Sequence, residues 1–427
     1  MMNVPFFIAK RIAFSGGHNP ARIIIRIANV AVALSMAVMI SATALIAGFK
    51  SEISKKIFEF WGHLHVSNAQ SYTFEPMPVS MDQPFYPSLA DLKTIPPAFF
   101  EYSGTVAPGK VYGGVKHIQV YALKPGIIRT KTEIEGIILK GIGADFDWSN
   151  LQPYLLEGRP IAFNDSAPSR EVLISRQTAD RLQVGVGDKF VVHFVKDRDQ
   201  LKRLFQICGI YKTGLEEYDR KFALCDIRQI QPLLDWDSTQ VAGFEIWIDD
   251  LRDLKRYNAY VDEEIVGDTL VSVSIRDKFP ALFQWLELQD YNEYVILGLM
   301  LAVALMNMIT ALLVLVLERS TMIGILKALG GRDGQVRQIF LYHALVITLT
   351  GMFWGNLLGL GFCYLQDTFH FIKLNEADYY LAYAPVKIQW WVVLGLNVGT
   401  VLLTMLFLQL PSLVISRISP LRAIRFQ

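Results

Sequence analysis

Four long apolar runs organise the chain, and the polar segments between them differ greatly in length. A helix rises about 1.5 Å per residue, so roughly 20 apolar residues cross the hydrocarbon core of a bilayer. The first run has no charged residue, and the fourth begins with two tryptophans, as expected at a membrane interface. The pattern predicts four transmembrane helices. The runs are Ile27–Gly48, Tyr294–Leu317, Ile339–Cys363 and Trp390–Leu410.

The long stretch between the first two runs has a different pattern. From about Gly62 to Phe279, short β-rich runs alternate with turns rich in Gly, Pro and Asp and with a few helix-like pieces. No apolar run inside it is long enough to span a bilayer. Its length allows a core of its own. We therefore expect an α+β domain inserted between helices 1 and 2, wholly outside the cytoplasm. The flanking segments Phe49–Phe60 and Ala281–Tyr294 keep helical spacing and are predicted to be stalks.

Basic residues set the expected orientation. They precede the first run without any acidic residue, and they recur after the second and fourth runs. By the positive-inside rule both termini are then cytoplasmic, in a multi-pass protein. A cleaved signal peptide is disfavoured, because the first apolar run is too long and its leader too extended. The basic residues are Lys10, Arg11, Arg22 and Arg26 before the first run, those of the segment 318–337 after the second run, and Arg417, Arg422 and Arg425 after the fourth.

These patterns divide the chain into nine predicted segments. Residues 5–14 are expected to form a short interfacial helix within the first segment. The segments are a cytoplasmic or interfacial part at 1–21, membrane helix 1 at 22–48, a periplasmic α+β domain with helical stalks at 49–291, membrane helix 2 at 292–317, a cytoplasmic helix at 318–335, membrane helix 3 at 336–365, a periplasmic loop at 366–389, membrane helix 4 at 390–411 and a cytoplasmic tail at 412–427.

Composition agrees with a few spans and one large soluble portion. Of 427 residues, 52% are hydrophobic, and the mean hydropathy is +0.30. The net charge of +1 gives no reason to expect a nucleic-acid partner. There are three cysteines and no CxxC spacing. Cys208 and Cys225 both fall in the soluble portion and can form a disulfide if their strands are neighbours. Two free buried thiols are the favoured interpretation.

The residues that usually carry catalysis are missing. The chain has no G-x-x-x-x-G-K-[ST] phosphate loop, no HExxH and no GxSxG. His63 and His65 alternate on a predicted strand, yet nothing pairs with them to complete a metal site. We therefore expect no enzyme activity, no metal and no cofactor in this chain.

Polar and small residues within the runs predict contacts between helices. Each run carries one asparagine, whose amide needs a partner in hydrocarbon and usually finds it on another helix. Gly351, Gly355 and Gly359 recur at every fourth residue and form a smooth face for close helix packing. The expected partner of that face is the first or the fourth membrane helix of this chain, or a second permease subunit. The asparagines are Asn29, Asn307, Asn356 and Asn397.

The segment Glu318–Gly331, ERSTMIGILKALGG, lies between the second and third runs. Its helix-spaced apolar residues and its charges predict a small amphipathic helix at the membrane surface, the alternative being a solvated loop. The amino-acid sequence of this segment resembles the coupling helix of the FtsX-type ABC permeases, in particular that of the lipoprotein-releasing (LolC/LolE) branch. Further similar phrases follow in the family's order: Phe7–Lys50, ILKGIGADFDW, LLEGRP, EVLISRQTADRLQVGVGDKF, GIYKTGLEEYD and LPSLVISRISPLRAIRF.

The resemblance implies a partner ATPase. In that family the coupling helix docks on a separate cytoplasmic ABC ATPase dimer, which binds ATP and Mg. The residues carried over to the contact are Glu318, Arg319, Ile323, Gly324, Lys327 and Gly330. Ile323 and Leu326 are expected to supply the apolar anchor, and Arg319 and Lys327 a charged rim.

The resemblance also implies the function. The expected protein is an inner-membrane permease that releases lipoproteins by mechanical coupling to its periplasmic domain, paired with a second copy or a paralogue. Acyl chains would enter from the membrane lipid through a cavity between helices 1 and 2. The alternative for each residue of its lining is ordinary contact with lipid or packing in the core. The candidate lining residues are Met36, Met39, Ile40, Leu299, Met300 and Met306.

One family feature is incomplete. Some lipoprotein-releasing permeases project a hairpin that catches a periplasmic lipoprotein carrier, and here the segment Lys196–Arg203 stands at about that position. It is short and lacks a proline-containing extension, so an ordinary hairpin tip is the alternative. The candidate contact residues are Lys196, Arg198, Lys202 and Arg203.

Two other functions fit the same pattern. One is a MacB-like efflux permease or an FtsX-like regulator of a cell-wall hydrolase, and the other is a membrane scaffold or sensor without transport.

Overall fold

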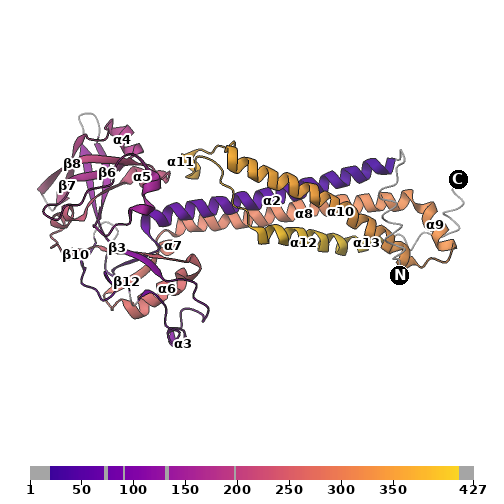
Figure 1. The fold of residues 1–427 in the computed structure, drawn as a ribbon, viewed down its shortest axis with the longest axis horizontal. Coiled ribbons are helices and arrows are strands. Elements are labelled where there is room, and N and C mark those ends of the chain that lie inside the picture. The colour runs from indigo at the N-terminus through magenta and orange to yellow at the C-terminus, as the bar shows by residue number, and fades with distance from the viewer. Residues whose placement is uncertain (1–19, 72–75, 90–91, 130–133, 197–198, 413–427) are drawn as a thin grey trace. The chain divides into compact units, whose positions relative to one another are not determined.

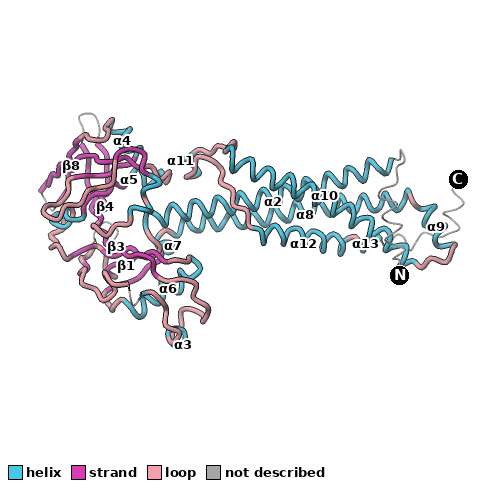
Figure 2. The backbone as a smooth tube through the Cα atoms, in the orientation of Figure 1, coloured by secondary structure: helices cyan, strands magenta, loops and turns pink. Residues whose placement is uncertain are grey.

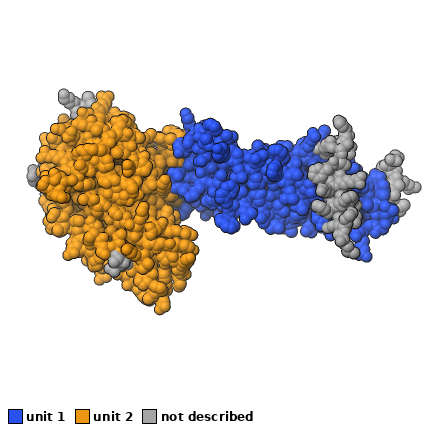
Figure 3. Space-filling view, in the orientation of Figure 1, with its two compact units in different colours: residues 1–52, 284–373, 383–427 blue, residues 53–283, 374–382 orange. Residues whose placement is uncertain are grey.

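The structure is a computed structural model that describes residues 20–71, 76–89, 92–129, 134–196 and 199–412. It divides into two compact units, coloured separately in Figure 3. The helical unit comprises residues 1–52, 284–373 and 383–427, and the α+β unit comprises residues 53–283 and 374–382. The predicted interfacial helix at 5–14 and the basic tail with Arg417, Arg422 and Arg425 lie outside the described residues.

Four helices are long and apolar enough to cross a membrane, as predicted. Each contains, or in the last case nearly contains, one of the apolar runs (Figure 1). They are α2 (Pro20–Trp61), α8 (Pro280–Glu318), α10 (Asp333–Phe369) and α12 (Trp390–Phe407). Two short helices complete this unit, α9 (Ser320–Ala328) and α13 (Gln409–Ser412).

The glycine face of α10 lies against α2. Of the partners expected for this face, the structure therefore shows the first membrane helix of this chain. A Cβ at Gly351 would meet Val32, and one at Gly359 would meet Ala37. The absence of side chains on this face lets the two backbones approach closely. Around this contact, a buried cluster joins residues of α2, α8, α9 and α10, such as Val32 and Phe340.

Three of the four predicted asparagines, Asn29, Asn356 and Asn397, form hydrogen bonds with another helix, as predicted. Asn356 and Asn397 exchange hydrogen bonds between their side chains across α10 and α12, at 2.7 and 3.0 Å. The Asn29 amide donates to Thr350 Oγ1 at 3.1 Å, which ties α2 to α10. These bonds specify which helix faces meet, in surroundings where apolar contacts alone are poorly selective.

The α+β unit contains all the strands that the structure describes, and in sequence they fall between α2 and α8 (Figure 2). Nearly all belong to one mixed sheet, with a separate β2–β10 pair. The strands are β1 (Leu64–Asn68), β2 (Val79–Ser80), β3 (Val115–Arg129), β4 (Ile134–Ile142), β5 (Leu155–Gly158), β6 (Glu171–Ser175), β7 (Lys189–Lys196), β8 (Asp199–Tyr211), β9 (Phe222–Asp226), β10 (Gln240–Val241), β11 (Gly243–Ile248) and β12 (Leu270–Ser274).

The strand pairings form two lobes that share β3. The later part of β3 belongs to a closed ring in the order β3, β4, β9, β6, β8, β7 and back to β3. Its earlier part continues the antiparallel order β12–β1–β11–β3. Short helices accompany the strands: α3 (Phe99–Tyr102), α4 (Arg176–Leu182), α5 (Glu216–Lys221), α6 (Leu254–Tyr260) and α7 (Ile275–Lys278). A ring leaves few open strand edges, which suits a domain exposed to other proteins.

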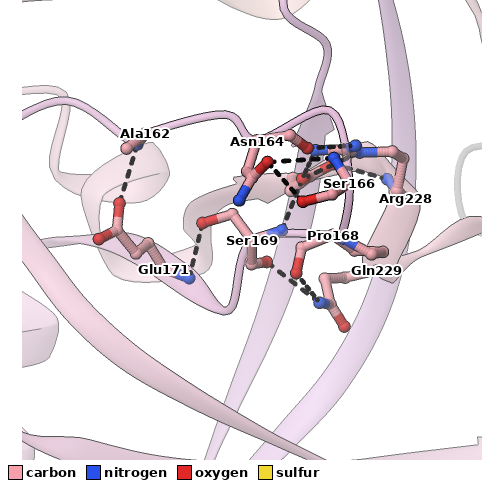
Figure 4. Close-up of polar contacts among 9 residues, drawn as sticks. Ala162, Asn164, Ser166, Pro168, Ser169, Glu171, Arg228 and Gln229 are labelled. Carbon is pink, nitrogen blue, oxygen red and sulfur yellow. Dashed lines mark hydrogen bonds and ion pairs between the residues drawn. The ribbon is translucent and has the colours of Figure 1, made fainter.

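The connection from β5 to β6 is fixed by side chains near the end of β9 (Figure 4). Ser169 N donates to Asp226 Oδ2 at 2.8 Å, and Arg228 donates to the Asn164 carbonyl at 2.8 Å. Ala162 N donates to Glu171 at 2.8 Å. The bonds satisfy backbone groups of a long connection that has no regular structure of its own.

Part of the loop between α10 and α12 belongs to the α+β unit. This is the stretch 374–382, which contains α11 (Glu376–Tyr379). Glu376 forms an ion pair with Lys212, and the Tyr380 carbonyl accepts a hydrogen bond from Lys56 Nζ at 3.0 Å. Sequence reasoning predicted only a short periplasmic loop here.

The described cysteines are free and buried, as favoured from the sequence. Cys208 lies on β8 and Cys225 on β9, two strands that are separated by β6 in the ring. Burial raises the pKa of the Cys208 thiol to about 12, so this group is a poor nucleophile at neutral pH.

Substitution of Gly355 tests the packing of α10 on α2. An added Cβ would lie 2.6 Å from Met36 Cβ and 2.7 Å from the Ala33 carbonyl oxygen. The helices must separate to admit it, so Gly355→Ala should lower the free energy of unfolding by about 1–3 kcal/mol. Gly361→Ala is the matched control, because nothing lies within 4 Å of its added Cβ. Equal thermal stability of both variants in detergent would contradict this packing.

His63 gives the α+β unit a dependence on pH. Burial, followed by the charge of Lys116, lowers the pKa of His63 to about 4, and the His63 Nδ1 atom accepts a hydrogen bond from Ile248 N at 2.9 Å. Unfolded histidine titrates near 6.5. Between these values the unfolded state binds the proton and the folded state does not, so this contribution is complete above pH 6.5 and is lost as the pH falls towards 4.

His63→Asn should therefore flatten the loss of stability on acidification. The amide oxygen can still accept the Ile248 bond but does not titrate. The difference in slope should be at most about 1.4 kcal/mol per pH unit, measured by denaturant unfolding over the same pH range. Parallel pH profiles for the variant and the wild type would refute the assignment to His63.

Candidate functional site

The predicted coupling segment is a short helix between two long ones. Helix α8 ends at Glu318, Arg319 alone intervenes, and α9 runs from Ser320 to Ala328. At the other end, Gly330 has a φ of +89°. Gly331 N donates to the Leu326 carbonyl at 2.9 Å and Gly330 N to the Lys327 carbonyl at 3.0 Å. This pair of bonds is a Schellman motif, which stops the helix before α10 begins.

One face of α9 belongs to the chain's own core. Ile323 is fully buried and joins a cluster with Val336 and Phe340 of α10. Gly324 beside it is buried too, and Leu326 packs against the same cluster. These residues hold α9 in place. The expectation that Ile323 anchors a partner requires a correction, because a side chain without exposed surface cannot contact another protein unless α9 leaves its own core. Leu326 is half-buried and keeps part of its surface exposed, so its predicted role as an anchor stays a prediction.

The opposite face of α9 carries exposed apolar side chains. Ile325 is 50% exposed and Leu329 is 80% exposed. Glu318 and Gly330 are exposed at the two ends of the segment. Sequence reasoning placed Ile325 and Leu329 on the helix but did not assign them the contact. An amphipathic pattern shows that two faces differ, and it does not show which apolar residues the chain keeps for itself.

Two charged residues of the segment, Arg319 and Lys327, are more buried than their predicted place on a charged rim implies. Lys327 Nζ lies 2.9 Å from Asp333 Oδ1 at the start of α10, and its side chain is largely buried. Arg319 is half-buried, and its Nε is buried without a hydrogen-bond partner in the described part of the chain. Lys327 therefore stabilises the turn between α9 and α10 in addition to any contact with a partner.

The six candidates for an acyl cavity divide into two groups. Met36, Met39 and Ile40 are buried in a cluster that also contains Val393 of α12. Leu299 and Met306 of α8 are 58% and 69% exposed, and Met300 is partly buried against that cluster. Met36 and Ile40 also lie beside the glycine face of α10. The structure does not bring the six together into one lining within this chain.

The charged segment near Lys196–Arg203 forms a tight hairpin. Lys196 pairs with Asp199, so β7 and β8 are joined by only two residues, one of which is Arg198 outside the described residues. Lys202 is exposed on β8 and Arg203 is half-buried. The lengths of β7 and β8 therefore determine how far this hairpin extends.

Both histidines of the predicted pair have hydrogen-bond partners. His63 Nδ1 accepts from Ile248 N, and His65 Nε2 lies 2.6 Å from the Trp61 carbonyl. Among the residues that the structure describes, no group of His, Cys, Asp and Glu has the arrangement of a metal site.

Comparison with known proteins identifies the two parts of the chain. A family model described as the MacB-like periplasmic core domain matches residues 27–263, and one described as the FtsX-like permease C-terminal matches residues 294–420. The lipoprotein-releasing system transmembrane protein LolC of Xylella fastidiosa is 22% identical over 413 residues, which cover 93% of this chain and 92% of that protein.

Two further relatives extend the comparison. The transmembrane protein LolE of the lipoprotein-releasing system of Haemophilus influenzae is 22% identical over 436 residues, 98% of each chain. The crystal structure of the extracellular domain of the noncanonic ABC-type transporter YknZ covers 37% of this chain and 81% of that chain, at 15% identity and a TM-score of 0.27, which is too low to carry an argument.

The matches define the class as an ABC permease subunit, a multi-pass membrane protein. The first model alone covers more than half of the chain. The chain belongs to the family of FtsX-type permeases with a MacB-like periplasmic core domain, and its resemblance to LolC and LolE is confirmed over nearly its whole length.

Gly330 offers a test of how α9 is ended. A residue with a side chain at a φ of +89° is strained, so Gly330→Ala should destabilise the turn by about 1–2 kcal/mol. The expected result is faster amide hydrogen exchange at the ends of α9 and α10. Gly334→Ala is the control, because it lies in the first turn of α10 with nothing within 4 Å of its added Cβ. The same exchange rates in both variants would contradict the role of Gly330.

Proposed function

We propose that this chain is the permease subunit of an ABC transporter that releases lipoproteins from the inner membrane, driven by a separate ATPase. The single observation that carries the proposal is the similarity to lipoprotein-releasing permeases over more than nine-tenths of both chains. A match of this extent includes the helices, the α+β unit and the coupling segment together.

The lengths of α2 and α8 support a mechanical role. They contain 42 and 39 residues, which at about 1.5 Å per residue gives rods of roughly 60 Å. The hydrocarbon core of a bilayer is only about 30 Å thick. Each rod therefore has a membrane part and a part beyond it, without proline after its first residue to bend it. Movement at one end of such a rod reaches the other end.

The exposed face of α9 is the proposed contact with the ATPase dimer. Ile325 and Leu329 present apolar surface, and buried Ile323 fixes α9 to the membrane helices behind it. ATP and Mg would be bound by the ATPase, and closure of its two subunits would push α9. Because α9 follows α8 after one residue, the push passes directly into that rod.

The route of the substrate follows from the exposed surface of α8. We assign Leu299 and Met306 to the contact with acyl chains from the membrane lipid, opposite a second permease copy or a paralogue. Methionine side chains adapt their shape, which suits a surface that receives chains of different lengths. In this arrangement the α+β unit is periplasmic, both termini are cytoplasmic, and the hairpin with Lys202 is the surface offered to a periplasmic carrier.

Purification from native membranes tests the assignment. The tagged protein is solubilised in mild detergent, and everything that co-elutes is identified by mass spectrometry, including acylated peptides. We expect a separate ABC ATPase, lipoproteins and a second permease if one is present. A cell-wall hydrolase or an outer-membrane efflux channel in place of lipoproteins would move the protein to the regulatory or efflux functions. The absence of any ATPase would refute the coupling role of α9, and the scaffold or sensor would then be favoured.

Substitution on the exposed face of α9 tests the contact itself. Ile325→Asp with Leu329→Asp should leave the fold intact, because both side chains are exposed, and should weaken ATPase binding by about tenfold or more through the loss of buried apolar surface. Gln338→Asp, also exposed near the start of α10, is the control. Undiminished recovery of the ATPase with the double variant would contradict the proposed contact.

A further inference from the structure

The last turn of α2 is bound by side chains from three strands. The Phe58 carbonyl accepts from Trp247 Nε1 of β11 at 3.1 Å, and the Phe60 carbonyl accepts from Lys140 Nζ of β4 at 2.7 Å. The Trp61 carbonyl is 2.6 Å from His65 Nε2 of β1. A helix end leaves four carbonyls without partners, and water usually satisfies some of them. Here side chains supply donors to three, and the Phe58 carbonyl also accepts from Gly62 N at 2.8 Å.

The central donor is part of a buried ion pair. Lys140 Nζ lies 2.7 Å from Glu245 Oε1, and neither side chain has any exposed surface. Glu245 Oε2 accepts from Gln119 Nε2 at 2.8 Å. Lys140 Nζ also lies over the ring of Trp61, 4.7 Å from its centroid. One ammonium group therefore binds the helix end and the sheet at the same time.

The second stalk joins the same network. Helix α7 ends at Lys278, two residues before α8 begins, and Lys278 Nζ lies 2.7 Å from His65 Nδ1. Burial, followed by the charge of Lys278, lowers the pKa of His65 well below its usual range. The imidazole is thus neutral, donates from Nε2 to the Trp61 carbonyl and accepts at Nδ1 from Lys278. We call Lys140, Glu245, Gln119, His65 and Lys278 the root cluster.

Stability alone does not account for the root cluster. Removing two charges from water costs more than their attraction usually returns, and apolar residues of the same size often serve a core at least as well. Directional bonds give something that apolar packing lacks, a single orientation of the bonded elements. The orientation fixed here is that of both stalk ends relative to the sheet of the α+β unit.

We propose that Lys140 and Glu245 are positioning residues for transport, because they lock the ends of both stalks to the sheet at one angle. Movement of α2 and α8 then turns the α+β unit as a rigid body, and none of it is lost at a flexible joint. The inference rests on the proposed function for its role in transport, and the rigidity of the joint can be measured without it.

The test replaces the ion pair by apolar residues of similar size in the full-length protein with its ATPase. Lys140→Met with Glu245→Leu removes both charges together, so that no buried charge is left alone. Single cysteines at Lys55 and Lys189, both exposed and both in the α+β unit, carry spin labels whose distance distribution reports the joint. The native thiols are buried and do not compete for the label.

We expect a folded variant with a broader distance distribution and about tenfold less lipoprotein released per ATP hydrolysed. Lys221→Met with Glu217→Leu removes an exposed ion pair outside the root cluster and should leave the distribution narrow. A folded variant whose distribution is as narrow as that of the wild type would overturn the proposal.

Two further results separate the possible failures. If the double variant does not fold, Lys140→Met with Glu245→Gln still removes the bond to the Phe60 carbonyl but keeps an acceptor for Gln119. It must broaden the distribution, and a narrow one overturns the proposal. If the distribution broadens but the wild type releases no lipoprotein, the joint stands as proposed and the assigned substrate is wrong.

Discussion

A buried ammonium group at the end of the first long helix is the constraint on which this structure depends most. Lys140 binds the Phe60 carbonyl and Glu245 at once, without exposed surface on either charged side chain. A charge in such a place is tolerated only where every partner is in position. The end of α2, the central strands β4 and β11 and, through His65 and Lys278, the start of the returning stalk are therefore fixed together.

Within the helical unit the constraints are steric and apolar. The glycine face of α10 admits α2, and Ile323 inserts α9 into the core formed by the membrane helices. The result is a surface helix that cannot move without its neighbours. Ile325 and Leu329 remain exposed. Under the proposed function, the first set of residues holds the helix and the second set receives the force from the ATPase.

Much of this architecture could be predicted from the sequence. Long uncharged runs such as Ile27–Gly48 are unambiguous because bilayer thickness fixes the length of a spanning helix. The alternation of short β-rich runs predicted the α+β unit, and the spacing of Gly351, Gly355 and Gly359 predicted a packing face. Periodicity reports local geometry, and these features are local.

The remaining features depend on which distant residues meet. The sequence did not tell which apolar residues of α9 face the chain's own core, so Ile323 was taken for a contact residue. It also did not show that Lys140 and Glu245 meet, although each interrupts an otherwise apolar run within its strand, IILKGI and FEIWI. A single charge within such a strand is the signal that could have been followed. The partner was out of reach because strand order is a long-range property.

Reconstitution tests the central claim most directly. The permease and its ATPase are placed in liposomes with a triacylated lipoprotein, and its appearance in the soluble fraction is followed together with phosphate release. The account predicts lipoprotein release that requires ATP hydrolysis and rises in proportion to it. Steady ATP hydrolysis with the lipoprotein still in the membrane, in the presence of a carrier or detergent acceptor, would contradict it.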